Sequence, residues 1–250
     1  MKPTDFDRTR EYPVLMYVYG GPGAQTVTNR WGSTRHLWHQ YLAKTYNMVI
    51  VSVDNRGTGG RGKAFQDVPY KKLGQPEAAD QITAAQHFAD STWVDADRIG
   101  IWGWSYGGYM TLLSMLDGEG PDTFDAGLSV APVTDWRFYD TIYTERYMTT
   151  PQQNPEGYAQ GAPLTMANRM HDDQDLLLVH GDFDDNVHFQ HSAQMVDALM
   201  EANQQFDFMM YPGRNHGIYG GTTRLHLFTL LTDAVEEMIV EEEPLIGATE

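Results

Sequence analysis

The sequence of 250 residues has no cysteine and no long apolar run. Without cysteine there can be no disulfide bond, no thiolate zinc site and no cysteine nucleophile. Without about 18 consecutive apolar residues, no helix can span a bilayer, and the N-terminus also lacks the apolar centre of a signal peptide. We therefore expect a soluble protein. The composition leaves its compartment open between the periplasm and the cytoplasm of a bacterium.

Basic residues are scarce as well. The 17 Lys and Arg face 34 Asp and Glu, so the formal net charge is −17 and the isoelectric point is near 4.7. This charge repels nucleic acids and anionic lipid surfaces, so neither is an expected partner. Only five residues are lysines, and an acidic, lysine-poor surface is one way to stay soluble in concentrated salt. A salt-adapted source and an ordinary acidic bacterial protein remain alternatives.

Short apolar runs alternate with longer amphipathic stretches along the chain. Near-continuous apolar strands fit a sheet that is covered on both faces, so the pattern predicts an α/β fold with a mostly parallel, doubly wound sheet flanked by helices. With no repeat and no long linker, residues 1–250 are expected to form one domain. The strands are expected at 14–19, 48–53, 99–104, 126–131, 175–180 and 206–211. The helices are expected at 33–45, 77–90, 106–117, 190–203 and 222–240, with a frayed acidic tail after them.

The segment "GWSYG", residues 103–107, has the form GxSxG and lies between an expected strand and an expected helix. A nucleophile elbow needs this context, because its serine occupies a sharp turn in front of a helix N-terminus. The flanking glycines are small where helix and strand crowd each other. The N–H of Tyr106 can donate to an oxyanion from the helix N-terminus. The context thus favours Ser105 as a nucleophile over a serine that lies between glycines by chance.

A serine nucleophile needs a histidine base, and the histidine needs an acid that holds its tautomer. In this architecture the acid and the base follow the serine in that order, in loops after later strands. The loop "GDFDDNVHF" follows the strand at 175–180, and "PGRNHGI" follows the strand at 206–211. The acid is therefore an aspartate near 184, and the base is His216. His180 and His188 are weaker alternatives for the base, because they lie where the acid is expected.

Six segments resemble the catalytic domain of the prolyl oligopeptidase family. The elbow tyrosine, "YTERYM" and "DDNVHF" resemble its dipeptidyl peptidase IV branch in particular. The resemblance implies an α/β-hydrolase fold and the hydrolysis of peptide bonds after proline or alanine, through an acyl-enzyme on Ser105. The segments are "YPVLMYVYGGPGAQ", "VDNRGTGGRG", "GWSYGGYM", "APVTDWRFYDTIYTERYM", "HGDFDDNVHFQ" and "YPGRNHGI".

The resemblance also implies the roles of individual residues. Ser105 is the nucleophile, Asp184 the acid and His216 the base, while the hydroxyl of Tyr19 joins the N–H of Tyr106 as an oxyanion donor. Asn186 binds the carbonyl that precedes the proline. A pyrrolidine ring offers only apolar surface, so a rigid aromatic box is complementary to it. The expected box consists of Tyr106, Val133, Trp136, Tyr139, Tyr143 and Val187.

In the dipeptidyl peptidase IV branch, a β-propeller precedes the catalytic domain and holds the free amine of the substrate. Nothing in these 250 residues matches it, so the resemblance implies a longer parent protein that releases N-terminal dipeptides. A homodimer formed through the segment 222–240 is a further expectation. Two other functions stay open, namely a stand-alone esterase or acyl hydrolase with the same triad, and a catalytically incomplete fragment.

Three patterns that suggest bound ligands fail in context. Residues 57–62 match a dinucleotide fingerprint, but prolines follow where its helix should run. Residues 182–186 begin like a calcium loop that then lacks the required glycine and glutamate. His36 and His39 lie one helical turn apart without a third ligand nearby. We therefore expect neither a metal nor a cofactor.

Overall fold

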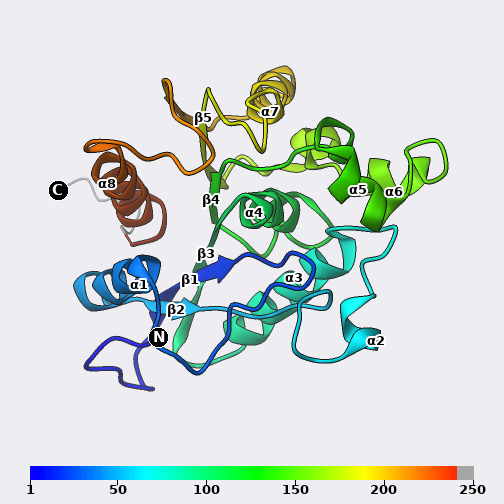
Figure 1. Cartoon of the computed structure of the whole chain (residues 1–250). Coiled ribbons are helices and arrows are strands. Elements are labelled where there is room, and N and C mark those ends of the chain that lie inside the picture. The colour runs from blue at the N-terminus through cyan, green and yellow to red at the C-terminus, as the bar shows by residue number, and fades with distance from the viewer. Residues whose placement is uncertain (241–250) are drawn as a thin grey trace.

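The computed structural model describes residues 1–240, in which six strands form one sheet (Figure 1). The strand order is β2-β1-β3-β4-β5-β6, and each of the five neighbouring pairs is parallel. The sheet is thus parallel throughout, as the alternation of strands and helices predicts. The strands are β1 (Tyr12–Val18), β2 (Val49–Val51), β3 (Val94–Trp104), β4 (Ala126–Val130), β5 (Asp175–Gly181) and β6 (Asp207–Tyr211).

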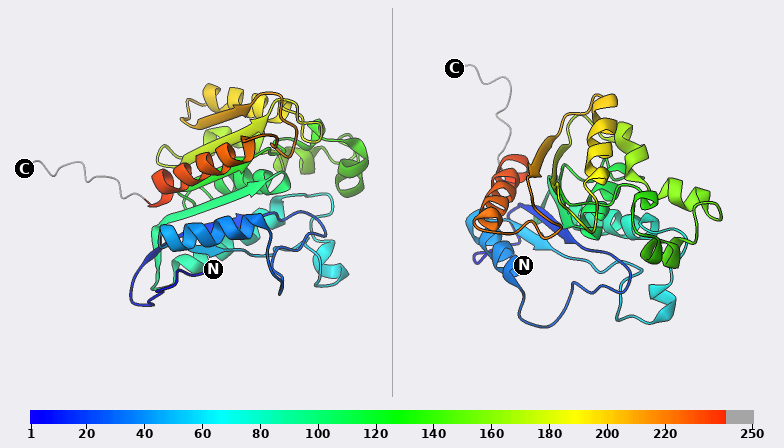
Figure 2. Two further views of the ribbon diagram at one scale, coloured as in Figure 1. Left: turned by 60° about the vertical axis from the view of Figure 1, so that its left-hand side comes forward. Right: turned by 45° about the horizontal axis from the view of Figure 1, so that its top comes forward.

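Helices cover both faces of the sheet (Figure 2). Helices α3 (Gln75–Ala89), α4 (Tyr106–Leu116) and α7 (Gln190–Glu201) pack on one face, and α1 (Thr34–Thr45) and α8 (Thr223–Val235) pack on the other. Shorter elements complete the chain. They are α2 (Lys63–Gln66), η1 (Trp136–Phe138), α5 (Thr141–Met148), α6 (Pro155–Gln160), η2 (Pro163–Arg169) and the π-helical turn η3 (Glu236–Val240).

Strand β1 shows why an apolar run becomes an interior strand. All seven of its residues are buried, because β2 and β3 flank it and helices cover both faces. Val14 and Met16 point into the core beneath α3 and α4, while Leu15 points into the core beneath α1 and α8. Successive side chains of a strand point to opposite faces, so a strand covered on both sides needs an apolar residue at every position.

The structure departs from the sequence expectations mainly at the ends of elements. Strand β3 begins at Val94, five residues before the expected start at 99, and β2 is shorter than expected. The helix expected at 222–240 ends as an α-helix at Val235 and continues as η3. The short helices within 63–66 and 136–169 are not predicted by the sequence pattern. The tail expected to fray, residues 241–250, lies outside the described residues.

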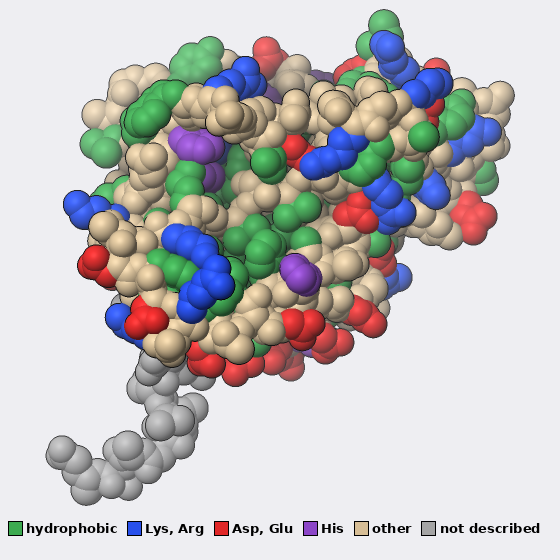
Figure 3. Space-filling model, turned by 90° about the horizontal axis from the view of Figure 1, so that it is seen from below, with side chains coloured by type: hydrophobic (Ala, Val, Ile, Leu, Met, Phe, Trp, Pro, Cys, Tyr) green, Lys and Arg blue, Asp and Glu red, His purple; other side chains and the backbone are tan. Residues whose placement is uncertain are grey.

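The surface reflects the acidic composition. In the view of Figure 3, Asp and Glu side chains gather along one edge of the face that is shown. Among residues 1–240, no helix is both long enough and apolar enough to cross a membrane.

Candidate active site

Ser105 occupies the turn between β3 and α4 with φ 63° and ψ −120°. A residue other than glycine rarely adopts this backbone, so the turn is strained. The neighbouring glycines permit it: a Cβ on Gly107 would lie 2.3 Å from the carbonyl oxygen of Val18, and a Cβ on Gly103 would lie 2.3 Å from that of Gly107. The N–H of Ser105 donates to the carbonyl of Val130 at 2.8 Å, which ties the turn to β4. The geometry is that of a nucleophile elbow.

Two donors with no acceptor of their own lie beside the elbow. The N–H of Tyr106, at the start of α4, and the hydroxyl of Tyr19, just after β1, make no hydrogen bond within residues 1–240. The two tyrosine rings lie 6.1 Å apart between centroids. Tyr19 is 38% exposed, and partial desolvation of its hydroxyl raises its pKa, so this group keeps its proton and can donate.

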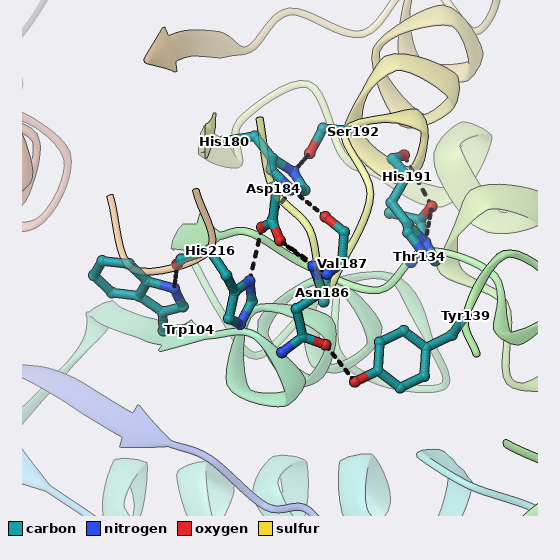
Figure 4. A network of polar contacts seen from close by, with 10 residues as sticks. All are labelled: Trp104, Thr134, Tyr139, His180, Asp184, Asn186, Val187, His191, Ser192 and His216. Atoms are coloured by element: carbon teal, nitrogen blue, oxygen red, sulfur yellow. Dashed lines mark hydrogen bonds and ion pairs between the residues drawn. The ribbon is translucent and has the colours of Figure 1, made fainter. Parts of the chain in front are cut away.

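Asp184 and His216 form a hydrogen-bonded pair (Figure 4). Asp184 follows β5 and His216 follows β6, so two neighbouring strands bring them together. Nδ1 of His216 lies 2.7 Å from Oδ2 of Asp184, and the carboxylate is buried. Since a carboxylate can only accept, Nδ1 carries the proton, and Nε2 of the neutral ring is left as a base.

The loop after β5 holds the Asp184 carboxylate through its own backbone. Oδ1 accepts the N–H of Asn186 at 3.0 Å and the N–H of Val187 at 2.9 Å. Burial alone would raise the pKa of Asp184, but the hydrogen bonds from His180 and His216 outweigh it and hold that pKa well below its ordinary value. Asp184 is therefore ionised at neutral pH.

His180 lies behind this carboxylate and is fully buried. Its Nε2 donates to the carbonyl of Val187 at 2.8 Å and to Oδ2 of Asp184 at 3.1 Å. Because a carbonyl only accepts, Nε2 carries the proton, and Nδ1 accepts from the hydroxyl of Ser192 at 2.6 Å. His180 thus supports the acid and does not face the elbow, and His188 is exposed. The sequence marks both histidines only as rivals to His216.

Trp104, the last residue of β3, joins the elbow to the loop of His216. Its indole N–H donates to the carbonyl of His216 at 3.0 Å, and the guanidinium of Arg224 lies over its ring at 4.9 Å from a ring centroid. Within the described residues, no hydrogen bond joins Ser105 to His216. Hydrogen bonds between catalytic groups are commonly long in unliganded sites and close only around substrate.

The residues expected to enclose a proline ring lie together next to the elbow. The ring of Trp136 stacks on Tyr143 at 6.0 Å and meets Tyr106 at 5.5 Å, and Val133 and Val187 are buried beside this cluster. Tyr139 packs against Trp136 at 5.8 Å and donates its hydroxyl to Oδ1 of Asn186 at 2.6 Å (Figure 4). That contact leaves the Asn186 amide N–H₂ available as a donor.

In two of the three rejected patterns, a side chain that could hold a metal instead bonds to protein groups. Both carboxylate oxygens of Asp184 accept hydrogen bonds from protein groups, so neither is left over for a calcium ion. His39 is buried and accepts the indole N–H of Trp102 at 3.1 Å. Burial lowers the pKa of His39 to about 3, so it is neutral.

A parallel sheet with a serine elbow after its central strand and an Asp–His pair after the last two strands defines the α/β-hydrolase class. Within that class, the prolyl oligopeptidase family matches residues 33–239. The chain belongs to this family of serine peptidases, which confirms the predicted fold and family.

Similar proteins carry the names of dipeptidyl peptidases. A probable dipeptidyl-aminopeptidase B of Arthroderma gypseum is 45% identical over 219 residues, which cover 87% of this chain and 23% of that protein. A solved structure of dipeptidyl peptidase 4 from Porphyromonas gingivalis superposes with a TM-score of 0.90 at 47% identity, over 95% of this chain and 33% of that one.

A second solved structure is also similar to this chain over nearly its whole length. It is a putative dipeptidyl aminopeptidase IV from Bacteroides ovatus, with a TM-score of 0.89 at 37% identity over 95% of this chain and 33% of that chain. The matched segment therefore covers between 23% and 33% of the length of these relatives.

Proposed function

We propose that this chain is a catalytic domain that hydrolyses peptide bonds after proline or alanine, and that the whole protein releases N-terminal dipeptides. The observation that carries the proposal is the aromatic box of Tyr106, Trp136 and Tyr143 directly beside the Ser105 elbow. A pocket with rigid aromatic walls would fit a pyrrolidine ring or a methyl group, and it would offer few polar contacts to a charged side chain.

The chemistry follows from the protonation states of the site. Oγ of Ser105 attacks the carbonyl carbon while Nε2 of His216 takes the hydroxyl proton, and Asp184 stabilises the imidazolium that forms. The carbonyl oxygen becomes an oxyanion, to which the N–H of Tyr106 and the hydroxyl of Tyr19 donate. His216 then protonates the leaving amine, and water hydrolyses the acyl-enzyme on Ser105 by the same steps in reverse order.

The remaining contacts would orient the substrate. The amide N–H₂ of Asn186 would donate to the carbonyl that precedes the proline, since the hydroxyl of Tyr139 donates to the amide oxygen and leaves the N–H₂ group available. Val133 and Val187 would close the apolar slot around the ring, with Tyr139 at its edge.

The relatives that resemble this chain are three to four times longer, which leaves room for further domains. We propose that one of them is a β-propeller that holds the free amine of the peptide, so that dipeptide release is a property of the whole protein. Homodimerisation through the segment 222–240, which forms α8 and η3 here, is part of the same proposal.

The proposal is tested by comparing two chromogenic substrates on the same preparation, a Gly-Pro amide and a short-chain phenyl ester, with Ser105→Ala as the blank. We expect the wild-type chain to cleave the amide and the Ser105→Ala variant to cleave neither. Cleavage of the ester alone would instead support a stand-alone esterase. Cleavage of neither would indicate a catalytically incomplete fragment.

A further inference from the structure

Helix α3 carries two polar side chains that are entirely withdrawn from water. Glu77 and Gln81 are each 0% exposed and lie four residues apart, so they share one face of the helix. The rest of that face is apolar and packs in the core, through Ala78, Ile82 and Ala85. Burying a carboxyl or an amide costs free energy unless hydrogen bonds replace the lost water. The hydrogen-bond partners of Glu77 and Gln81 therefore indicate the role of these two side chains.

Glu77 holds the far end of Tyr106. Its Oε1 accepts the Tyr106 hydroxyl at 2.8 Å. The backbone of Tyr106 follows Ser105, and the centroid of its ring lies 6.1 Å from that of Tyr19 and 5.5 Å from that of Trp136. The position of this one side chain thus sets both a wall of the aromatic box and the orientation of the N–H that faces the elbow.

Gln81 reaches the other side of the elbow through one intermediary. Its amide N–H₂ donates to Oδ1 of Asn55 at 2.9 Å, and Asn55 in turn donates to the carbonyl of Gly20 at 3.0 Å. Asn55 is itself buried. Gly20 directly follows Tyr19, so this chain of hydrogen bonds fixes the backbone from which the Tyr19 hydroxyl extends.

We propose that Glu77 and Gln81 are positioning residues through which α3 holds both oxyanion donors of the elbow in place. Glu77 acts through Tyr106, and Gln81 acts through Asn55 on Tyr19. This inference rests on the proposed function, which assigns the two tyrosines as donors. Neither residue touches the reacting atoms.

The surroundings of Glu77 explain why a neutral replacement is informative. It accepts the hydroxyl of Tyr106, and it interacts electrostatically with Tyr109, with Tyr143 and with the Arg56–Asp80 ion pair. Burial raises the pKa of Glu77 to about 7, against the hydrogen bond from Tyr106. Its Oε2 has no hydrogen-bond partner. A glutamine at position 77 therefore keeps the hydrogen bond from Tyr106, because its carbonyl oxygen can accept the same hydroxyl.

The test measures how fast a fluorophosphonate labels Ser105 in the full chain, since this probe needs an activated serine and an oxyanion hole. Glu77→Leu removes the acceptor and is expected to slow labelling by about 10- to 100-fold, while Glu77→Gln stays within about threefold of wild type. Thr83→Ala, on the exposed side of α3, is the matched control and should label at the wild-type rate.

Double-mutant cycles separate positioning from a general loss of structure. If Glu77 acts through the Tyr106 hydroxyl, then Glu77→Leu combined with Tyr106→Phe labels no more slowly than either single variant. The same is expected of Gln81→Leu combined with Tyr19→Phe. Additive losses in both cycles would overturn the inference.

Three further outcomes of the test have distinct meanings. If Glu77→Leu does not fold, Tyr106→Phe carries the test, because it removes only the hydroxyl that Glu77 binds; labelling at the wild-type rate would then overturn the inference. If the wild-type chain itself is not labelled at Ser105, the proposed function fails and the inference fails with it. Wild-type labelling with unchanged rates in the variants would refute the inference alone.

Discussion

At the scale of single residues, the site depends on one buried carboxylate. Asp184 accepts four hydrogen bonds, two from backbone N–H groups of its own loop and two from histidines. Each donor favours the charged form, which is why the pKa of Asp184 stays low despite its burial. An ionised Asp184 in turn keeps the proton of His216 on Nδ1, so the acid fixes the tautomer of the proposed base.

Substitution of His180 tests directly whether this side chain stabilises the Asp184 carboxylate. His180→Phe keeps a ring of similar size but removes the N–H that Asp184 and Val187 accept, so two buried acceptors each lose a donor. We expect the free energy of unfolding to fall by about 1–3 kcal/mol and kcat to fall about tenfold. Urea denaturation and amide hydrolysis would measure both effects.

His188→Ala is the control for that experiment, because the side chain is exposed on the same loop. It should leave stability and kcat near their wild-type values. Equal losses in the two variants would show that the loop is merely sensitive to substitution and that His180 has no special role.

At the scale of elements, the elbow depends on the close approach of helix α4 and strand β1. The N-terminus of α4 lies against the end of β1, so the strained turn of Ser105 and the backbone of Tyr19 support each other. A Cβ on Gly107 would lie 2.3 Å from the carbonyl oxygen of Val18 and 3.3 Å from the Cα of Tyr19.

Gly107→Ala is therefore expected to push β1 and α4 apart. Overpacking of this kind costs about 1–3 kcal/mol of stability, and here it also displaces the backbone of Tyr19. We expect a lower denaturation midpoint together with a fluorophosphonate labelling rate reduced at least about tenfold. A variant that loses stability but labels at the wild-type rate would show that the α4–β1 contact does not position the oxyanion donors.

Whether an element can be predicted from the sequence depends on its burial and its length. Interior strands such as β1 and β5 are recognisable because burial on both faces demands a continuous apolar run. The first half of β3 is missed because it carries Asp95, Asp97 and Arg98, which are polar and partly exposed at the end of the sheet. The short helices between β4 and β5 are too brief to show a helical period.

The residues of the candidate site likewise divide into those that the sequence marks and those that it does not. Ser105, Asp184 and His216 are predictable because a motif and a chain order mark them. Glu77 and Gln81 are not, because each is a polar residue of an ordinary helix whose partner lies 29 or 26 residues away in the sequence. The partners of His180 are near in the sequence, but the pattern does not show that its ring turns towards Asp184. Only the fold brings Glu77 to Tyr106 or Gln81 to Asn55.

At the scale of the whole molecule, the buried Glu77 links stability to pH. Its pKa rises from 4.5 in the unfolded chain to about 7 in the folded protein, so between these values the folded state holds a proton that the unfolded state has lost. The contribution of Glu77 to stability is therefore greatest below pH 4.5 and is lost, by about 3 kcal/mol, as pH rises through 7.

Glu77→Gln removes that titration. Relative to wild type, the variant should gain about 3 kcal/mol in the free energy of unfolding between pH 5 and pH 8. Urea denaturation of both proteins at several pH values measures the difference. A difference that does not change with pH would contradict the burial of an ionisable group at this position.

The net charge of −17 also acts on the whole molecule, because like charges repel one another in the compact state. The acidic side chains along one edge in Figure 3 concentrate this repulsion. Salt at molar concentration shortens the reach of these charges to about 3 Å. We expect Tm to rise from low to molar NaCl, as it would in a salt-adapted protein, and an unchanged Tm would count against that origin.

The central claim is that the fold assembles an activated Ser105 from residues that lie far apart in the sequence. The measurement that tests it most directly is fluorophosphonate labelling of the chain, with Ser105→Ala as control and mass mapping of the modified residue. The account predicts one adduct, on Ser105, and none in the Ser105→Ala variant. An unlabelled wild-type chain, or an adduct on another residue, would contradict it.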